Sequence, residues 1–271
     1  MMDRANTKAT ERANKKREKI KLLRDNRRIK VGVPATGKIR TKPMSKNSKR
    51  TVYPSKVLWV ELNQTRKILS DGKNHRKIGG AVLVGHLKGA KIMALSLEER
   101  ATCPTTCGFW TTCYGNNMPH TNRWKVDKNF YHQLHSEIHD LCQKHEKVLI
   151  RLHVLGDFPD IKYLDFWHEM IDQYENLHIF GFTAWEEGTE IGDEIIGLRK
   201  MKPDRWAVRT SGHVGEWGSF TIDFPTEKTM IGGGVVCPEQ LDANNDGSKE
   251  KHCGNCAVCW QTSHPIVFVE H

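Results

Sequence analysis

Seven of the chain's eight cysteines fall into two groups whose spacing suits metal binding. The groups are Cys103, Cys107 and Cys113 in a short stretch, and Cys237, Cys253, Cys256 and Cys259 near the C-terminus. Thiolates are ligands of zinc and of iron–sulfur clusters. In a reducing compartment, cysteines grouped at CxxCxxC spacing more often bind metal than form disulfides. We therefore expect all seven to ligate metal, with Cys142 standing apart.

The downstream group has four potential ligands, enough to close a tetrahedral zinc site or to hold a cubane iron–sulfur cluster. Cys253, Cys256 and Cys259 follow CxxCxxC spacing, and the remote Cys237 precedes a proline. This pattern is closer to ferredoxin-type ligation than to structural zinc sites, which more often pair two CxxC motifs. An iron–sulfur cluster is the expected cofactor, and zinc is the alternative.

The upstream group has three thiols, which leave one coordination position open. On a cubane cluster the open iron could bind a small molecule, and on zinc the open position could activate water. His120 or His153 could instead supply a fourth ligand. The competing interpretation is that all seven thiols serve purely structural sites.

The elements that must position these groups alternate between strand and helix. Strands are predicted at 57–60, 81–84, 92–95, 148–154, 177–182, 206–210, 230–236 and 266–269, and helices at 122–147, 161–174 and 189–200. Strand–helix alternation with short loops predicts an α/β fold with a parallel sheet, either open and doubly wound or a complete or partial (β/α) barrel. A barrel-like sheet, complete or partial, is the fold class that we expect.

Active sites in such sheets form beyond the carboxyl ends of the strands. Asp157 follows Gly156 at one such end and is the expected catalytic group, as nucleophile, base or acceptor for purine N–H groups. The alternative is a helix N-cap, for which Asp160 is better placed. The residues expected to contact substrate are His153, Trp185, Arg209 and Tyr114.

Positive charge is concentrated at the N-terminus. Residues 1–50 hold 18 Lys and Arg against 4 Asp and Glu, a net charge of +14 in a chain of net +10, so the remainder carries −4. A dense basic block favours contact with a nucleic-acid backbone, DNA more than RNA, over a merely solvated tail. The expected contacts come from a basic helix over 7–29 and the following linker: Lys15, Lys16, Arg17, Arg27, Arg28, Lys38 and Arg40.

A partial phosphate-loop match at 32–38 carries no weight, because Ile39 replaces the hydroxyl residue that would hold magnesium. The chain has 38% hydrophobic residues, no apolar run of membrane-spanning length and no secretory signal at its start. We expect a cytoplasmic protein without a membrane partner. Three parts are predicted: a basic arm at 1–54, an α/β domain at 55–236, and a cysteine-rich metal-binding segment at 237–271 packed on that domain.

Three features resemble the gene product eighty-eight family, cysteine-rich α/β proteins of phages and prophages. They are the Cys-Pro loop ending in Cys113-Tyr114, the Gly156-Asp157-Phe158 turn followed by Tyr163-Leu164, and the tail from Cys237-Pro through Cys253-Gly-Asn-Cys256-Ala-Val-Cys259-Trp. The resemblance covers about residues 81–271 and implies a phage protein working in the host cytoplasm. The family name brings no established activity with it.

The order of motifs is also similar, more loosely, to two enzyme classes. Radical S-adenosylmethionine enzymes with an auxiliary cluster share the three early cysteines and the C-terminal cluster, which implies S-adenosylmethionine as a possible cofactor. They typically use CxxxCxxC, whereas five residues separate Cys107 from Cys113 here. Guanine transglycosylases share a strand-end aspartate and a metal site, but their zinc pattern of three cysteines and a histidine is not reproduced.

Two functions of different class follow. The first is a metal-dependent enzyme, iron–sulfur or transglycosylase-like with structural zinc, that modifies a nucleic-acid base. The second is a non-catalytic nucleic-acid-binding or redox-sensing module.

Overall fold

The computed structural model describes residues 47–61, 64–222, 234–241 and 251–269. The chain divides into one compact unit of residues 43–269 and another of residues 1–42 with 270–271. The predicted basic helix and its seven nucleic-acid contacts lie outside the described residues. The sheet and the C-terminal cysteines belong to the same compact unit. Among the described helices, none has both the length and the apolar character needed to cross a membrane.

The described strands form one large sheet with the order β2-β3-β5-β6-β7-β8-β10-β9. Its strands are β2 (Ser70–Asp71), β3 (Lys91–Ala94), β5 (Val148–Leu152), β6 (Leu177–Thr183), β7 (Trp206–Ser211), β8 (Gly218–Ile222), β9 (Val235–Val236) and β10 (Ile266–Val269). Every neighbouring pair is parallel except β2 with β3. The predicted α/β class with a parallel sheet is confirmed. In the described residues β2 and β9 are separate edges, so a complete barrel is not formed.

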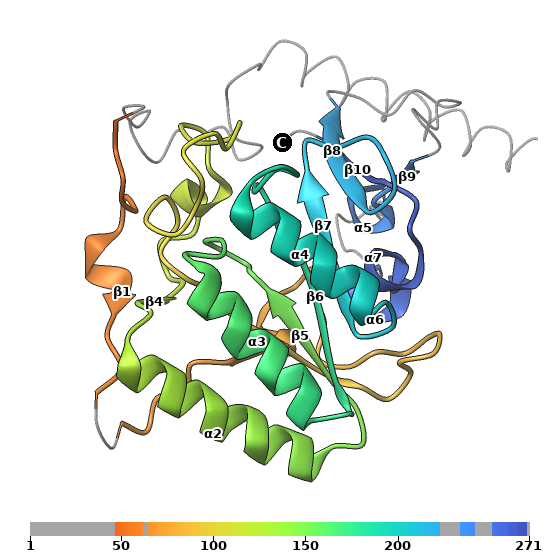
Figure 1. The fold of residues 1–271 in the computed structure, drawn as a ribbon, viewed down its shortest axis with the longest axis horizontal. Helices are drawn as coiled ribbons and strands as arrows, with labels where there is room; N and C mark the ends of the chain where they lie inside the picture. The colour runs from red at the N-terminus through yellow and green to blue at the C-terminus, as the bar shows by residue number, and fades with distance from the viewer. Residues whose placement is uncertain (1–46, 62–63, 223–233, 242–250, 270–271) are drawn as a thin grey trace, which may run out of the picture. The chain divides into compact units, whose positions relative to one another are not determined.

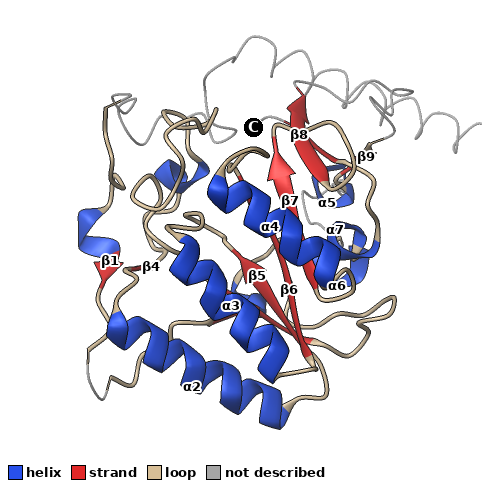
Figure 2. Cartoon of the chain, viewed as in Figure 1, coloured by secondary structure: helices blue, strands red, loops and turns tan. Residues whose placement is uncertain are grey.

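Three helices cover one face of this sheet (Figure 2). They are α2 (Lys128–Lys144), α3 (Ile161–Gln173) and α4 (Glu190–Met201). A capping residue precedes each helix, and its side chain accepts a hydrogen bond from a backbone N–H of the first turn. The capping residues are Asp127, Asp160 and Thr189 respectively. The predicted N-cap role of Asp160 is confirmed. Beneath the helices, alternate residues of β5 point into the larger hydrophobic core because side chains alternate along a strand.

The C-terminal cysteines lie on the opposite face. There Ala257 and Trp260 pack against Leu149, Phe180 and Ala207 of the central strands. The short helices α6 (Cys253–Cys256) and α7 (Val258–Gln261) carry three of the four downstream cysteines. The sheet therefore separates a helical layer from a layer that contains the cysteine-rich segment.

Two predicted elements differ from the structure. The run 81–84 forms only one bridge, from Ala81 to Lys91, because Leu83 instead donates its N–H to Gly254 O at 2.7 Å. The helix predicted from 122 begins at residue 128, because 123–124 form a strand with 57–58. The remaining short elements are η1 (Pro54–Lys56), β1 (Val57–Leu58), η2 (Gly72–Asn74), η3 (Tyr114–Asn117), β4 (Arg123–Trp124) and α5 (Pro238–Leu241).

Candidate metal centres

Both cysteine groups follow the carboxyl ends of strands in the parallel sheet. The upstream group comes after β3, and Cys237 comes directly after β9. Because all strands from β3 to β9 are parallel along the sheet, these ends lie on one edge. Cys237 directly follows its strand, whereas Cys103 and Asp157 are separated from the ends of β3 and β5 by loop residues.

The four downstream cysteines line one small pocket of about 20 Å³. The cysteine helix α6 is held beside the sheet by the loop before β3, where Cys253 N donates to Lys77 O at 2.7 Å and Gly254 N to Ile78 O at 3.0 Å. Ala257, in the left-handed region at φ 60°, turns the chain between α6 and α7 and so brings Cys259 back to the pocket. On the far side, Cys237 N donates to Val267 O of β10 at 2.8 Å.

Burial makes these thiols poor acids in the absence of a cation. It raises the pKa of Cys237, Cys253 and Cys259, and the neighbouring thiol of Cys259 raises that of Cys253 further. A bound metal would reverse this preference, because its charge stabilises the thiolate form and ligation releases the protons.

The donor set of the pocket fits a thiophilic metal. In the present side-chain arrangement of the described residues, no group of three or more His, Cys, Asp or Glu converges on a metal position. Four thiols nevertheless line one pocket, and all eight cysteines of the chain are free rather than in disulfides. Trp260 lines the same pocket, and its buried Nε1 has no hydrogen-bond partner among the described residues. An N–H donor beside ligating sulfurs is a recognised outer-shell feature of metal sites.

The three upstream thiols form a second, separate group. Burial raises the pKa of Cys103, Cys107 and Cys113, and for Cys103 the next contribution is the negative charge of Asp157. Each resolved thiol–thiol interaction joins members of one group, as between Cys103 and Cys113 or between Cys253 and Cys259. The seven cysteines thus form two separate groups.

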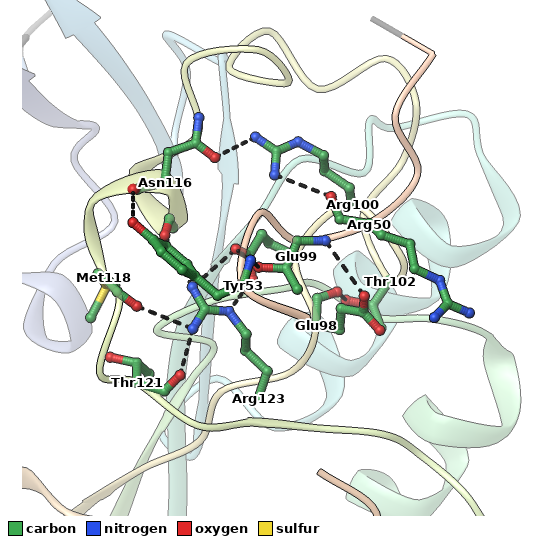
Figure 3. A network of polar contacts seen from close by, with 12 residues as sticks. Arg50, Tyr53, Glu98, Glu99, Arg100, Thr102, Asn116, Met118, Thr121 and Arg123 are labelled. Atoms are coloured by element: carbon green, nitrogen blue, oxygen red, sulfur yellow. Dashed lines mark hydrogen bonds and ion pairs between the residues drawn. The ribbon is translucent and has the colours of Figure 1, made fainter. Parts of the chain in front are cut away.

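A buried ion pair anchors the loop that carries the upstream thiols (Figure 3). Arg123 Nε lies 2.7 Å from Glu99 Oε2 and its Nη2 lies 3.1 Å from Oε1, with both side chains almost completely buried. Arg123 also donates to the carbonyl oxygens of Gly115, Met118 and Thr121. One guanidinium group therefore fixes the return of the loop just after Cys113.

A second arginine braces the middle of the same loop. Arg100 Nε donates to Trp110 O at 2.8 Å. Its Nη2 donates to Asn116 Oδ1 at 2.6 Å (Figure 3). The segment before β1 adds Tyr53, whose hydroxyl donates to Asn116 O at 2.7 Å, and Thr51, whose hydroxyl donates to Glu99 at 2.6 Å. Sequence reasoning missed this network, because spacing alone cannot show that distant charged residues meet inside the protein.

Asp157 has a structural position rather than an open one. Its carboxylate accepts hydrogen bonds from Phe158 N at 2.9 Å, Thr183 Oγ1 at 2.8 Å and Ala184 N at 2.7 Å, and the residue is only 3% exposed. Burial raises its pKa to about 6, and these hydrogen bonds oppose the rise. The catalytic prediction required a carboxylate facing a cleft, whereas this one joins the ends of β5 and β6.

The four residues predicted to contact substrate lie apart in different environments. His153 is buried with Nε2 2.8 Å from the Tyr163 hydroxyl, and burial lowers its pKa to about 3. Arg209 is fully buried, and Trp185 donates Nε1 to Phe158 O at 2.8 Å. Tyr114 alone among the four is well exposed, at 52%. His120 is also exposed.

Comparisons of the chain with protein-family models, with curated proteins and with solved structures found no match.

Proposed function

We propose that the protein is a metal-dependent enzyme that modifies a nucleic-acid base, with a closed four-thiolate site and an open three-thiolate site. The observation that carries the proposal is the division of seven thiols into two separate groups, four that line one pocket and three in the loop after β3. Four thiols satisfy a metal's coordination, whereas three leave a position for a substrate or cosubstrate. The closed site then stabilises the fold, and the open site carries the chemistry.

Cys103, Cys107 and Cys113 would hold an iron–sulfur cluster at the open site, and when bound it would supply redox chemistry at its unligated iron. The chain's own contribution is rigidity, because Arg100 and Arg123 hold the loop on both sides of Cys113. A loop so braced keeps its ligands in one geometry before the metal binds.

Aromatic side chains beside the open site support a nucleic-acid substrate. Phe109 and Tyr114 are 42% and 52% exposed and lie in the loop that carries the thiols. Exposed aromatic rings stack on unpaired bases of any sequence. The net charge of +14 in residues 1–50 would supply contacts to the phosphate backbone.

The metal is identified by absorbance and metal analysis of the full chain purified without oxygen. A broad band near roughly 400 nm with bound iron and sulfide supports iron–sulfur ligation. A colourless protein with neither iron nor zinc would overturn the proposal.

The substrate class is tested separately by binding to single-stranded DNA and RNA. Replacing Phe109 and Tyr114 by alanine should weaken binding, since base–aromatic stacking contributes about 1–3 kcal/mol per base. Trp59→Ala is the matched control, because Trp59 is equally exposed at 57% but lies outside the loop. Equal losses in the control and in the loop variants would contradict the assignment.

A second candidate, base exchange supported by structural zinc, is favoured by one observation. The four-thiol pocket has a volume of about 20 Å³, and a cavity of this size takes one water-sized occupant. As it stands, that volume suits a single ion better than a cubane. Stoichiometric zinc without iron in the purified chain would select this alternative.

A further inference from the structure

Two arginines lie on the sheet face that the C-terminal cysteines cover. Side chains two residues apart along a strand point to the same face of a sheet. Arg151 of β5 therefore shares a face with Leu149, and Arg209 of β7 shares it with Ala207. Both of these apolar neighbours pack against the cysteine-rich segment. Arg209 has no exposed surface, and the guanidinium of Arg151 lies 4.6 Å from the centroid of the Phe182 ring. Arg209 is therefore held between the sheet and the layer above it, and the half-buried Arg151 lies on the same face of the sheet.

Arg209 binds the turn that immediately follows the last downstream cysteine. Its Nε donates to Cys259 O at 2.9 Å and its Nη1 to His264 O at 2.8 Å, while its Nη2 donates to Thr262 O. These acceptors are neutral carbonyl groups, so they orient the guanidinium without cancelling its charge. The thiol of Cys259 is the nearby group that could carry a compensating negative charge.

Arg151 approaches the same thiols from the neighbouring part of the sheet. Its charge interacts with Cys253 and Cys259, and also with Asp157. Its one direct hydrogen bond among the described residues runs from Nη1 to Leu152 O at 2.8 Å. The Asp157 carboxylate accepts its three hydrogen bonds from other groups, and the two thiols become anions when they ligate a metal.

A buried charge is stable only when an opposite charge or a metal compensates it. Across the described ranges, no ion pair joins Arg151 or Arg209 to a carboxylate. Two cations without a carboxylate ion-pair partner thus lie on the sheet face that carries the cysteine-rich segment, whose four thiols become anions when a metal binds.

We propose that Arg151 and Arg209 are the counter-ions of the four-thiolate site, and that this site takes a group of charge +2. Four thiolates with zinc(II), or with a doubly charged [4Fe–4S] core, leave two negative charges in a buried site. The two guanidinium groups neutralise them. This assignment rests on the metal site proposed above and gives the two arginines a positioning role within it.

The test is the rate at which the bound metal leaves the full chain for an excess of chelator without oxygen. It is run in a Cys107→Ser background, so that the four-thiol site is the one observed. Arg151→Gln should release its metal about 10-fold to 100-fold faster, the usual effect of losing an outer-shell partner. Arg151→Lys, which keeps the charge, should release it close to the parent rate.

Arg199→Gln is the matched control. Arg199 also donates to a backbone carbonyl, Val208 O at 2.7 Å, and like Arg209 it lies over the Trp217 ring, but its resolved charge partner is Glu187 rather than a thiol. Unchanged release in this control, with faster release from Arg151→Gln and Arg209→Gln, supports the proposal.

Two outcomes contradict it and differ in meaning. A parent protein that binds no metal at the four thiols overturns the metal site itself, and the counter-ion assignment with it. A parent that binds metal, with Arg151→Gln and Arg209→Gln both releasing it at the parent rate, overturns the counter-ion assignment alone. Circular dichroism identifies a variant that fails to fold. Because Arg151→Gln removes a single direct hydrogen bond of the described residues, this variant should stay folded and keep the comparison decisive.

Discussion

Replacing Arg123 with methionine should destabilise the protein by about 3–5 kcal/mol, the usual cost of breaking a buried ion pair from one side. The Glu99 carboxylate would stay buried, with the Thr51 hydroxyl as its remaining direct donor. The carbonyl groups of Gly115, Met118 and Thr121 would each lose the guanidinium donor. Since single domains are stable by roughly 5–15 kcal/mol, this loss would be a large fraction of the total.

The opposite substitution should cost less. In Glu99→Gln, the Arg123 guanidinium keeps its carbonyl acceptors, and the new amide oxygen can still accept one of its N–H groups. We expect about 1–3 kcal/mol, the cost of impairing a buried hydrogen bond. The structure therefore predicts an asymmetry between the two halves of one ion pair.

Urea unfolding followed by circular dichroism measures both losses. Labelling with iodoacetamide under native conditions adds a local measurement, because loosening the loop should expose Cys113 while Cys142, buried in α2, remains protected. The reasoning is refuted if Arg123→Met costs less than about 1 kcal/mol, well under the buried-pair range, or if Glu99→Gln proves the more costly change.

Three further predictions concern the ends of the strands, the arm and the cysteines. Burial raises the pKa of Asp157 to about 6, so its stabilising contribution is complete below the unfolded value of 3.8 and is lost as the pH rises through 6. Between pH 5.0 and 7.5 the parent should lose about 1 kcal/mol more unfolding free energy than Asp157→Asn, and equal losses in urea unfolding would contradict this. Deleting residues 1–50 should weaken DNA binding and flatten the slope of log K against log salt without unfolding the domain, whereas an unchanged slope would exclude the arm from the interface. Cys256→Ala should lower the melting temperature and the soluble yield, whereas Cys107→Ala should keep a folded protein, because binding energy at a closed metal site is folding energy. Equal losses of melting temperature and soluble yield in the two variants would show that the downstream group contributes no more to folding than the upstream group.

The sequence predicted the regular part of the fold well, because local signals agreed there. Helix α3 begins where Asp160 caps it and ends within one residue of the predicted end. The strands β5 and β7 lie where apolar runs predicted them. Strands β2 and β8 were missed because they are stabilised by pairing with distant segments rather than by their own composition.

For the candidate sites too, the sequence predicted the features that local spacing determines and missed those that depend on packing. Spacing was enough to separate the cysteines into two groups, since ligands close in sequence are close in space. It was not enough for Asp157, because a carboxylate at a strand end can face a cleft or bind backbone amides, and packing alone decides between them. The roles of Arg123 and Arg209 depend on partners 24 and 50 residues away, and that of Arg151 on still more distant thiols, so none had a local signal.

The most direct test of the two-site account is the metal content per chain of the full-length protein and of two cysteine variants, all purified without oxygen. The account predicts that Cys256→Ser and Cys107→Ser each remove a different share of the bound metal, and that the two losses add to the parent content. It is contradicted if both variants remove the same metal, which would mean one shared site, or if the parent carries none.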